Sequence, residues 1–472
     1  MTNRSRPPVP NAPLVARLVL PQDPADNMTI YSEHRERFLE SLAETGAAAV
    51  IPTATEKTRN HDCTYRFRPH SDFWYLTGFV EPGAVLVLLP NGKGEEDSPR
   101  SVLFLRERDR LKEIWHGRRL GIERAPDELD IDEARPIEDL WDALPELLKG
   151  YESIVYRTGE DEDRDRHMLG VTSRLRSMAR GGIVGPAAIV DPAPTLHEQR
   201  LHKTDGEVAL MRRAAEITTE AHGAAMAVTA PGRNESEVEA LIEYIFRKRG
   251  STGPAYSSIV AGGVNACILH YVENNMELRD GDLLLVDAGA EEQFYASDVT
   301  RTWPVGGTFS PEQRAVYQVV LDAQLVGVEH CKPGNTFASV HEVVVRKLVE
   351  GLVEIGLLEG DVDSLIDDHA YDRFYMHKTG HWLGLDVHDQ GAYSVDGDSR
   401  ALEAGMVTTV EPGLYIAEDD EQVEARWRGI GVRIEDDILI TKTGHENLTA
   451  AIPKTIEAVE AACAKEALTP VS

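Results

Sequence analysis

The sequence has few cysteines and no long hydrophobic run. Its four cysteines, Cys63, Cys267, Cys331 and Cys463, show no CxxC spacing, which argues against a disulfide framework or a thiolate zinc site and favours a reducing compartment. No stretch approaches the roughly 20 apolar residues that a membrane-spanning helix needs. The N-terminal segment contains arginine but no sustained apolar core of the kind found in signal peptides. We therefore expect a cytoplasmic protein that does not associate with membranes.

Positive charge is also scarce. The 472 residues include 49 Lys and Arg against 80 Asp and Glu, which gives a formal charge of −31. Nucleic acids and anionic membranes bind through Lys and Arg, so this balance disfavours both partners and is typical of a well-solvated surface. The hydrophobic content of 42% is that of an ordinary globular protein, and the length predicts more than one domain.

The pattern along the chain predicts an arm and two domains. Residues 1–30 are rich in Pro, Asn and Asp and are expected to form an extended arm. Residues 31–200 alternate amphipathic and short apolar segments, such as HRERFLESLAET, GAAAVIP and GAVLVLLP, which indicates an α/β domain. Residues 201–472 are expected to form a larger α+β domain. Helix starts are predicted in this second domain at capping pairs, namely Thr204 with Glu207, Asn234 with Glu237, and Ser310–Pro311 with Gln313.

The second domain contains an internal repeat. The pattern Leu278-x-x-Gly281-x4-Val286-Asp287-x-Gly289 recurs 124 residues later as Leu402-x-x-Gly405-x4-Val410-Glu411-x-Gly413. Each copy reads as a turn glycine, a short strand, and a carboxylate before another glycine. A further acidic segment follows each copy, YASDVTRTW and GVRIEDDILI. The repeat predicts two related halves whose carboxylates converge between them.

Four acidic residues lie in segments that are otherwise apolar. They are Asp287 in LLLVDAG, Asp298 in YASDVTRTW, Glu411 in VTTVEPG and Glu435 in GVRIEDD. Asp287 and Asp298 are separated by a turn sequence, so a hairpin can bring both to one end. Carboxylates at strand ends are commonly capping or salt-bridging groups. A buried carboxylate, however, needs a partner. The local cations Arg301 and Arg433 are too few to pair with all four acids.

A histidine-rich segment completes the candidate site. His377, His381 and His388 fall within twelve residues in YMHKTGHWLGLDVHD, which is flanked by glycines. Four carboxylates and an imidazole form a hard, oxygen-dominated ligand set that suits two divalent ions, with Mn²⁺ preferred and Zn²⁺ or Co²⁺ as alternatives. A purely structural zinc site would instead use Cys and His tetrads.

This series of motifs resembles the Xaa-Pro aminopeptidases (aminopeptidase P), which belong to the pita-bread metallopeptidases. The match covers the chain from about residue 205, and RNHDCTYRFRPHSDFWYLTGFVEPGAVLVLLP resembles their N-terminal domain. The resemblance implies an α/β N-terminal domain, a pseudo-symmetric pita-bread catalytic domain, and a homodimer or homotetramer. It also implies a metal-dependent exopeptidase that releases the N-terminal residue from peptides with proline in second position, through a hydroxide bridging two metal ions.

The resemblance further implies roles for individual residues. Asp298 and Glu435 would bridge both metals, Asp287 would complete one, and His381 and Glu411 would complete the other, with Glu411 also relaying a proton. By the same resemblance, His270 would contact the substrate at the scissile carbonyl, His388 would assist proton transfer, and His377 would line the pocket for the prolyl ring. Tyr256 and Arg433 would support the metal site. Trp115 would help to close the site of a neighbouring subunit. Lys378 departs from the family pattern, in which we expect a small residue after His377.

Several related activities compete with this interpretation. A prolidase, which cleaves Xaa-Pro dipeptides, would use the same five ligands and stays open as the alternative. A creatinase-type hydrolase and a metal-free binding protein would each lack part of the ligand set, which is complete here. A methionine aminopeptidase is usually shorter, and no P-loop lysine supports a nucleotide enzyme.

Overall fold

The computed structural model describes residues 24–90 and 100–464, and the chain divides into two compact units between Gln199 and Arg200. Helix α1 begins at Pro24, so the expectation of an extended arm is wrong for residues 24–30. Proline fits the first turn of a helix because its missing N–H would have no partner there. Residues 1–23 of the expected arm lie outside the described residues.

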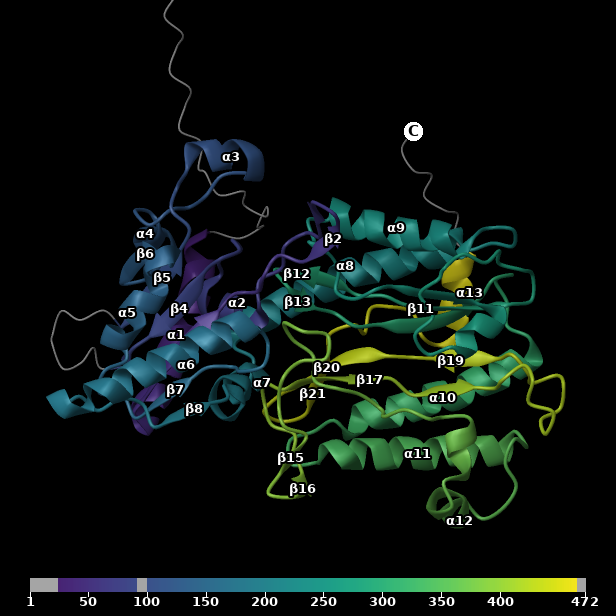
Figure 1. The fold of residues 1–472 in the computed structure, drawn as a ribbon. Helices are drawn as coiled ribbons and strands as arrows, with labels where there is room; N and C mark the ends of the chain where they lie inside the picture. Colours follow the sequence, from purple (N-terminus) through teal and green to yellow (C-terminus); the bar gives the residue numbers. More distant parts are fainter. Residues whose placement is uncertain (1–23, 91–99, 465–472) are drawn as a thin grey trace, which may run out of the picture. The chain divides into compact units, whose positions relative to one another are not determined.

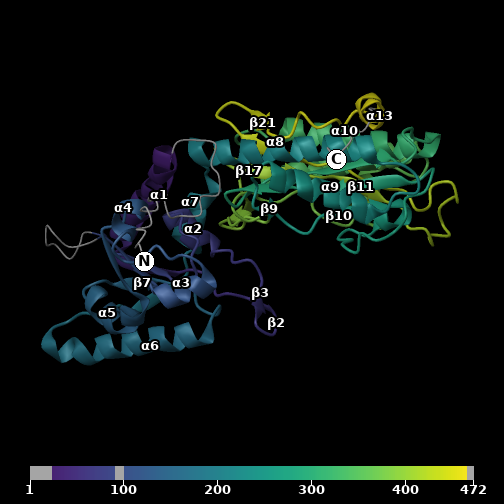
Figure 2. The same cartoon turned by 90° about the horizontal axis from the view of Figure 1, so that it is seen from above.

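The first unit is built on a mixed sheet with the strand order β6-β5-β4-β1-β7-β8. Strand β4 runs antiparallel to β1 and β5, whereas β7 runs parallel to β1 and β8. In Figure 2, α1 lies on one side of this sheet and α5 and α6 on the other. The helices are α1 (Pro24–Thr45), α2 (Ser71–Thr77), α3 (Arg110–His116), α4 (Ala125–Leu129), α5 (Leu140–Leu147), α6 (Glu162–Ser177) and α7 (Glu198–Leu201), which spans the division between the units. The strands are β1 (Ala47–Pro52), β2 (Thr58–Asn60), β3 (Cys63–Thr64), β4 (Val85–Leu88), β5 (Ser101–Leu105), β6 (Glu133–Pro136), β7 (Ser153–Val155) and β8 (Ala188–Val190).

Alternation along the strands builds the core of this unit. Val50 of β1, Val87 of β4 and Phe104 of β5 pack against Leu144 of α5 and Val171 of α6. Strand β1 reads AAAVIP and is buried on both faces, which is expected of a central strand with helices on either side. The apolar runs identified in the sequence are therefore the central strands of an α/β unit.

The second unit combines short antiparallel sheets with long helices. In Figure 1, α8 and α9 lie on one side of its strands and α10 and α11 on the other. The helices are α8 (Asp205–Val228), α9 (Glu235–Lys248), α10 (Pro311–His330), α11 (Phe337–Glu354), α12 (Val362–Asp367) and α13 (Ile456–Cys463). The strands are β9 (Gly253–Pro254), β10 (Ile259–Gly262), β11 (Leu283–Asp287), β12 (Ala290–Glu292), β13 (Tyr295–Ala296), β14 (Thr300–Pro304), β15 (Ser394–Val395), β16 (Asp398–Ser399), β17 (Val407–Val410), β18 (Gly413–Tyr415), β19 (Gly431–Arg433), β20 (Asp436–Ile440) and β21 (His445–Asn447).

The internal repeat corresponds to two similar halves of this unit. Strands β10-β11-β14 form one sheet and β17-β20-β21 another. Gly281 and Gly405, which precede β11 and β17, have φ angles of +87° and +94°, a conformation that glycine adopts without the steric cost of a side chain. All three predicted capping pairs are present at the starts of α8, α9 and α10. This pseudo-symmetric unit has the pita-bread fold.

No helix in residues 24–90 and 100–464 is long and apolar enough to cross a membrane.

Candidate metal centre

Three of the predicted ligands come from segments far apart in the sequence and meet at one point. Asp298, His381 and Glu435 each offer a ligand atom, and these atoms all lie within 4.8 Å of one another. The His381 Nε2 atom is 3.2 Å from Asp298 Oδ2. Its other ring nitrogen, Nδ1, is 3.0 Å from the Trp382 carbonyl oxygen. A bond from Nδ1–H to that carbonyl would leave the lone pair of Nε2 facing the carboxylates, as a metal-ligating histidine requires.

The acids lie at strand ends rather than within continuous strands. The segment GVRIEDDILI is divided into β19 and β20, and Glu435 lies in the break between them. Asp298 lies between β13 and β14, Glu411 lies between β17 and β18, and Asp287 is the last residue of β11. The hairpin expected around Asp287 is present, since β11 pairs antiparallel with β14 and places Asp287 opposite Thr300. Leaving the strand ladder at these points lets the acidic side chains turn toward a common centre.

The other two predicted ligands border this group. Glu411 Oε1 is 3.7 Å from His381 Nε2, and the Glu411 backbone N–H donates to the Thr379 carbonyl oxygen. Asp287 accepts hydrogen bonds from the Tyr256 hydroxyl at 2.6 Å and from Arg433 Nη2 at 2.7 Å. Tyr256 and Arg433 thus hold one of the five predicted ligands directly.

Burial of so many acids in one place disfavours their charged forms. Desolvation, reinforced by repulsion from neighbouring carboxylates, raises the pKa of Glu435 well above its usual value and that of Glu411 to about 7. Burial also raises the pKa of Asp287, even with Arg433 alongside. Burial alone would lower the pKa of His381, but its contact with Asp298 raises it to about 9. A bound cation would take the place of these protons and stabilise the ionised carboxylates.

This donor set fits divalent cations. Four carboxylates and one imidazole offer the oxygen and nitrogen atoms that such ions prefer, and the three central donors already lie close together. The Glu435 carboxylate is also held by a residue that is not itself a predicted ligand, because the Thr300 hydroxyl donates a hydrogen bond to its Oε2 atom at 2.8 Å. Such supporting contacts are typical of metal sites.

A second group of polar side chains lies next to the centre. The Tyr415 hydroxyl is 2.9 Å from His377 Nε2 and accepts a hydrogen bond from Arg433 Nη1 at 3.1 Å. His377 Nδ1 is 3.9 Å from Glu411 Oε2. Burial lowers the pKa of His377 to about 4, so this imidazole is neutral at physiological pH and offers a polar, uncharged wall to the site.

The remaining predicted residues are less closely attached. His388 is exposed and its ring packs edge-on against that of His381, with 4.3 Å between centroids. His270 is also exposed. Trp115 belongs to the first unit, where it lies on α3 with 83% of its surface exposed. Lys378, the departure from the family pattern, is exposed.

Sequence reasoning missed Thr300, Thr409 and Tyr415 as members of the site. Alternation could have indicated them, because side chains two residues apart on an extended segment share a face. Thr300 stands two residues after Asp298, and Thr409, whose hydroxyl is 3.4 Å from Glu411 Oε1, stands two residues before Glu411. Arg301, expected as a local cation for the site, instead pairs with Asp436.

The fold and the site define a metal-dependent hydrolase. Residues 209–442 match the model of metallopeptidase family M24, and residues 31–156 match that of the aminopeptidase P N-terminal domain. The Xaa-Pro aminopeptidase of Escherichia coli is 47% identical over 91% of this chain and 96% of its own length. The structure of Pseudomonas aeruginosa aminopeptidase PepP superposes with a TM-score of 0.89, at 48% identity, covering 93% of this chain and 98% of that one. Zinc-substituted E. coli aminopeptidase P in complex with product gives a TM-score of 0.88 at 46% identity, covering 92% and 98%.

The chain belongs to the Xaa-Pro aminopeptidases of metallopeptidase family M24. This membership confirms the resemblance on which the sequence interpretation rests, and it favours an aminopeptidase over a prolidase.

Proposed function

We propose that this enzyme removes the N-terminal residue from peptides whose second residue is proline. The observation that carries the proposal is the convergence of Asp298, His381 and Glu435 from both halves of a family M24 fold. It is supported by the similarity of the chain to Xaa-Pro aminopeptidases in sequence and to aminopeptidase P in structure. The substrate is then a short peptide Xaa-Pro-Yaa, and neither nucleic acid nor membrane is a partner.

Five residues would hold the two metal ions, which we propose to be Mn²⁺, with Zn²⁺ or Co²⁺ as alternatives. Asp298 and Glu435 would contact both ions, Asp287 one of them, and His381 with Glu411 the other. When bound, such ions polarise the scissile carbonyl and lower the pKa of water so that it becomes a nucleophile at neutral pH.

The chain's own groups would bind and orient the peptide. The free α-amine of the substrate would bind one metal ion or the nearby carboxylates, which restricts cleavage to the N-terminal residue. Glu411, which lies 3.7 Å from His381 and 3.9 Å from His377, would accept the proton of the attacking water and return it to the departing prolyl nitrogen. His270 would donate to the oxyanion that forms at the scissile carbonyl, and His388 would assist proton transfer.

The specificity for proline would come from the neighbouring polar group. His377, Tyr415 and Arg433 are connected by hydrogen bonds, so their positions are fixed before substrate arrives. A preformed pocket of this kind accepts the rigid pyrrolidine ring with little loss of conformational entropy. A longer or flexible second residue would not gain the same contacts.

Four further features belong to the same proposal. The chain comprises an N-terminal α/β domain that ends at about residue 200 and a catalytic domain over residues 201–472. It works in the cytoplasm and assembles as a homodimer or homotetramer. In that assembly, the exposed Trp115 would help to close the site of a neighbouring subunit.

Peptide hydrolysis after metal removal tests the proposal. The EDTA-treated enzyme is assayed with and without Mn²⁺ on Ala-Pro-Ala and Ala-Pro, and on Ala-Ala-Ala as a control of equal length. We expect Mn²⁺-dependent release of alanine from Ala-Pro-Ala, with slow cleavage of Ala-Pro and none of Ala-Ala-Ala. Faster cleavage of the dipeptide would identify a prolidase, and no cleavage by metal-loaded protein would show that the substrate is of another kind.

A further inference from the structure

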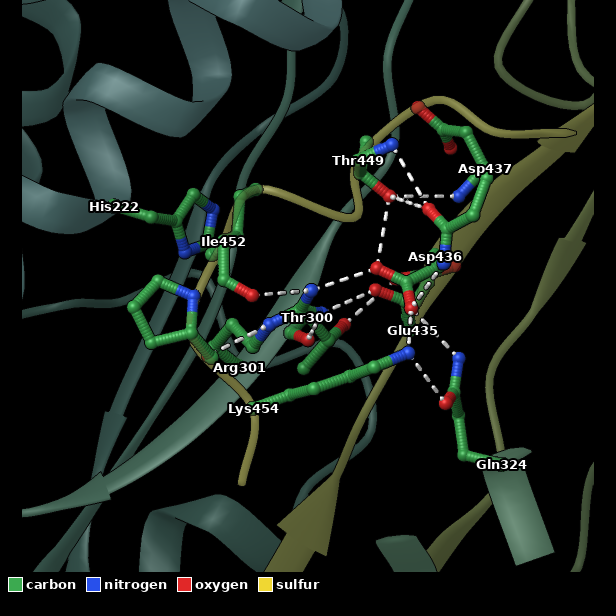
Figure 3. A network of polar contacts seen from close by, with 12 residues as sticks. His222, Thr300, Arg301, Gln324, Glu435, Asp436, Asp437, Thr449, Ile452 and Lys454 are labelled. Atoms are coloured by element: carbon green, nitrogen blue, oxygen red, sulfur yellow. Dashed lines mark hydrogen bonds and ion pairs between the residues drawn. The ribbon is translucent and has the colours of Figure 1, made fainter. Parts of the chain in front are cut away.

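The acidic motif that contains Glu435 continues with two more carboxylates that the proposed reaction does not use. Asp436 and Asp437 begin β20 and are 0% and 1% exposed. Neighbouring residues on a strand point to opposite faces, and the two aspartates accordingly contact different parts of the unit (Figure 3). Both contact sets lead back to the segments that carry Asp298 and Glu435.

Asp436 is the fully buried centre of an ion network. Its carboxylate accepts hydrogen bonds from Arg301 and Lys454, both at 2.6 Å, and from three neutral side chains, Gln324 and Thr449 at 2.8 Å and Asn447 at 2.9 Å. The ion pair with Asp436 fixes the Arg301 guanidinium.

Arg301 uses all five of its N–H donors. Besides Asp436, its acceptors are four backbone carbonyl oxygens, those of Thr300, Glu435, Ile452 and Pro453. Thr300 and Glu435 belong to different halves of the unit, and the Glu435 N–H in turn donates to the Thr300 carbonyl. A planar guanidinium with every donor satisfied fixes the distance between these two backbones, which a lysine with three donors from one atom cannot do.

Asp437 holds the other central ligand. Its carboxylate accepts the Asp298 backbone N–H at 3.2 Å and the Ser297 hydroxyl at 2.9 Å. The Asp437 backbone N–H donates to the Thr449 hydroxyl at 3.1 Å, and that hydroxyl is also bonded to Asp436. Asp437 thus ties the backbone of Asp298 to β20, directly next to Glu435.

We propose that Arg301, Asp436 and Asp437 are positioning residues that fix the backbones of Glu435 and Asp298 at metal-binding distance before any metal arrives. The inference rests on the metal centre proposed above. Like charges at the centre repel one another, and the site stays compact because the two backbones are fixed by contacts outside it. Removing these contacts lets the carboxylates move apart and weakens metal binding, even though no ligand is altered.

The test measures Mn²⁺ affinity of the EDTA-treated full-length protein by calorimetry, together with its melting temperature. Arg301→Lys keeps the charge beside Asp436 but loses the fixed donors, and we expect its Kd for Mn²⁺ to rise roughly 10- to 100-fold, the range measured when supporting residues of metal sites are replaced. Leu352→Ala, in the apolar core at α11, is the control for lost stability and should keep wild-type affinity.

Asp437 offers a second, independent pair of variants that covers the case in which Arg301→Lys does not fold. Asp437→Ala removes the acceptor for the Asp298 N–H and should weaken Mn²⁺ binding, whereas Asp437→Asn retains a carbonyl oxygen there and should restore it. Wild-type affinity in both Arg301→Lys and Asp437→Ala, or the same loss of affinity in Leu352→Ala, would overturn the inference. Failure of the wild-type protein itself to bind Mn²⁺ would instead overturn the proposed metal centre.

Discussion

Gly289, two residues after Asp287, lies very close to the backbone of the segment that carries Asp298. A Cβ atom at Gly289 would lie 1.6 Å from the Ser297 carbonyl oxygen, where an ordinary contact is at least 3.4 Å. Because this obstacle is backbone rather than a flexible side chain, Gly289→Ala would force the strand segments apart by about 1.8 Å. The displaced residue is the immediate neighbour of Asp298.

The cost of this substitution can be worked from the contacts it disturbs. The hydrogen bonds Ala288 N–H to Val299 O and Ser297 N–H to Ala290 O, each 3.0 Å long, flank Gly289. Losing both costs about 1–3 kcal/mol, and overpacking adds about 1–3 kcal/mol. For a domain of this size each kcal/mol lowers the melting temperature by about 2–4 °C, so we expect a fall of roughly 5–20 °C.

Calorimetric melting with and without Mn²⁺ checks this prediction. A bound ligand stabilises the folded protein by an amount that grows with the logarithm of its concentration divided by its Kd. The wild-type protein should therefore gain stability with Mn²⁺, and Gly289→Ala should gain less. Gly223→Ala in α8 is the matched control, since no atom lies within 4 Å of its added Cβ, and alanine stabilises a helix interior by up to about 1 kcal/mol. A Gly289→Ala protein with wild-type melting and a full response to Mn²⁺ would refute the reasoning.

Three further predictions concern individual side chains. Asp298→Ala or Glu435→Ala should reduce peptide hydrolysis to background by loss of metal, and full activity with full metal content in either variant would contradict the ligand assignment. His388→Ala should keep the wild-type Kd for Mn²⁺ and lower kcat by roughly 10²- to 10⁴-fold; loss of metal instead would exchange the roles of His381 and His388. Burial lowers the pKa of His222 from 6.5 to about 4 in the folded protein. As the pH falls below 6.5, this histidine therefore binds a proton in the unfolded chain but not yet in the folded one. The free energy of unfolding consequently decreases between pH 6.5 and 4. Between pH 7.5 and 5.0 this decrease is about 2 kcal/mol. In urea unfolding, the stability of His222→Gln should therefore depend less on pH than that of the wild-type protein. The same pH dependence in both proteins would contradict this prediction.

Much of the fold follows from local signals in the sequence. The capping pairs at Thr204, Asn234 and Ser310 begin helices because each side chain satisfies backbone N–H groups that a helix leaves unpaired. The turn glycines Gly281 and Gly405 mark the starts of β11 and β17 for a similarly local reason. Helix α1 was placed too late because its first turns, with Pro24 and several polar residues, read like a loop.

The site could be predicted only in part. The acids stood out because they interrupt apolar segments, but their partners depend on which strands pair, and that is a long-range property. Thr300 contacts Glu435 only because β14 lies beside β19, the strand that directly precedes Glu435. Arg301 points away from the centre because alternation places it on the opposite face from Thr300. Alternation likewise predicts that Asp436 and Asp437 point to opposite faces of a strand, but it does not reveal which residues each of them holds.

The central claim is that five side chains from both halves of the second unit form a two-metal site. A crystal structure of the Mn²⁺-loaded protein, with anomalous diffraction recorded at the manganese edge, tests it most directly. The account predicts two anomalous peaks per chain that share Asp298 and Glu435, with Asp287 completing one and His381 and Glu411 the other. A single peak, or peaks away from these residues in protein that shows Mn²⁺-dependent hydrolysis, would contradict it.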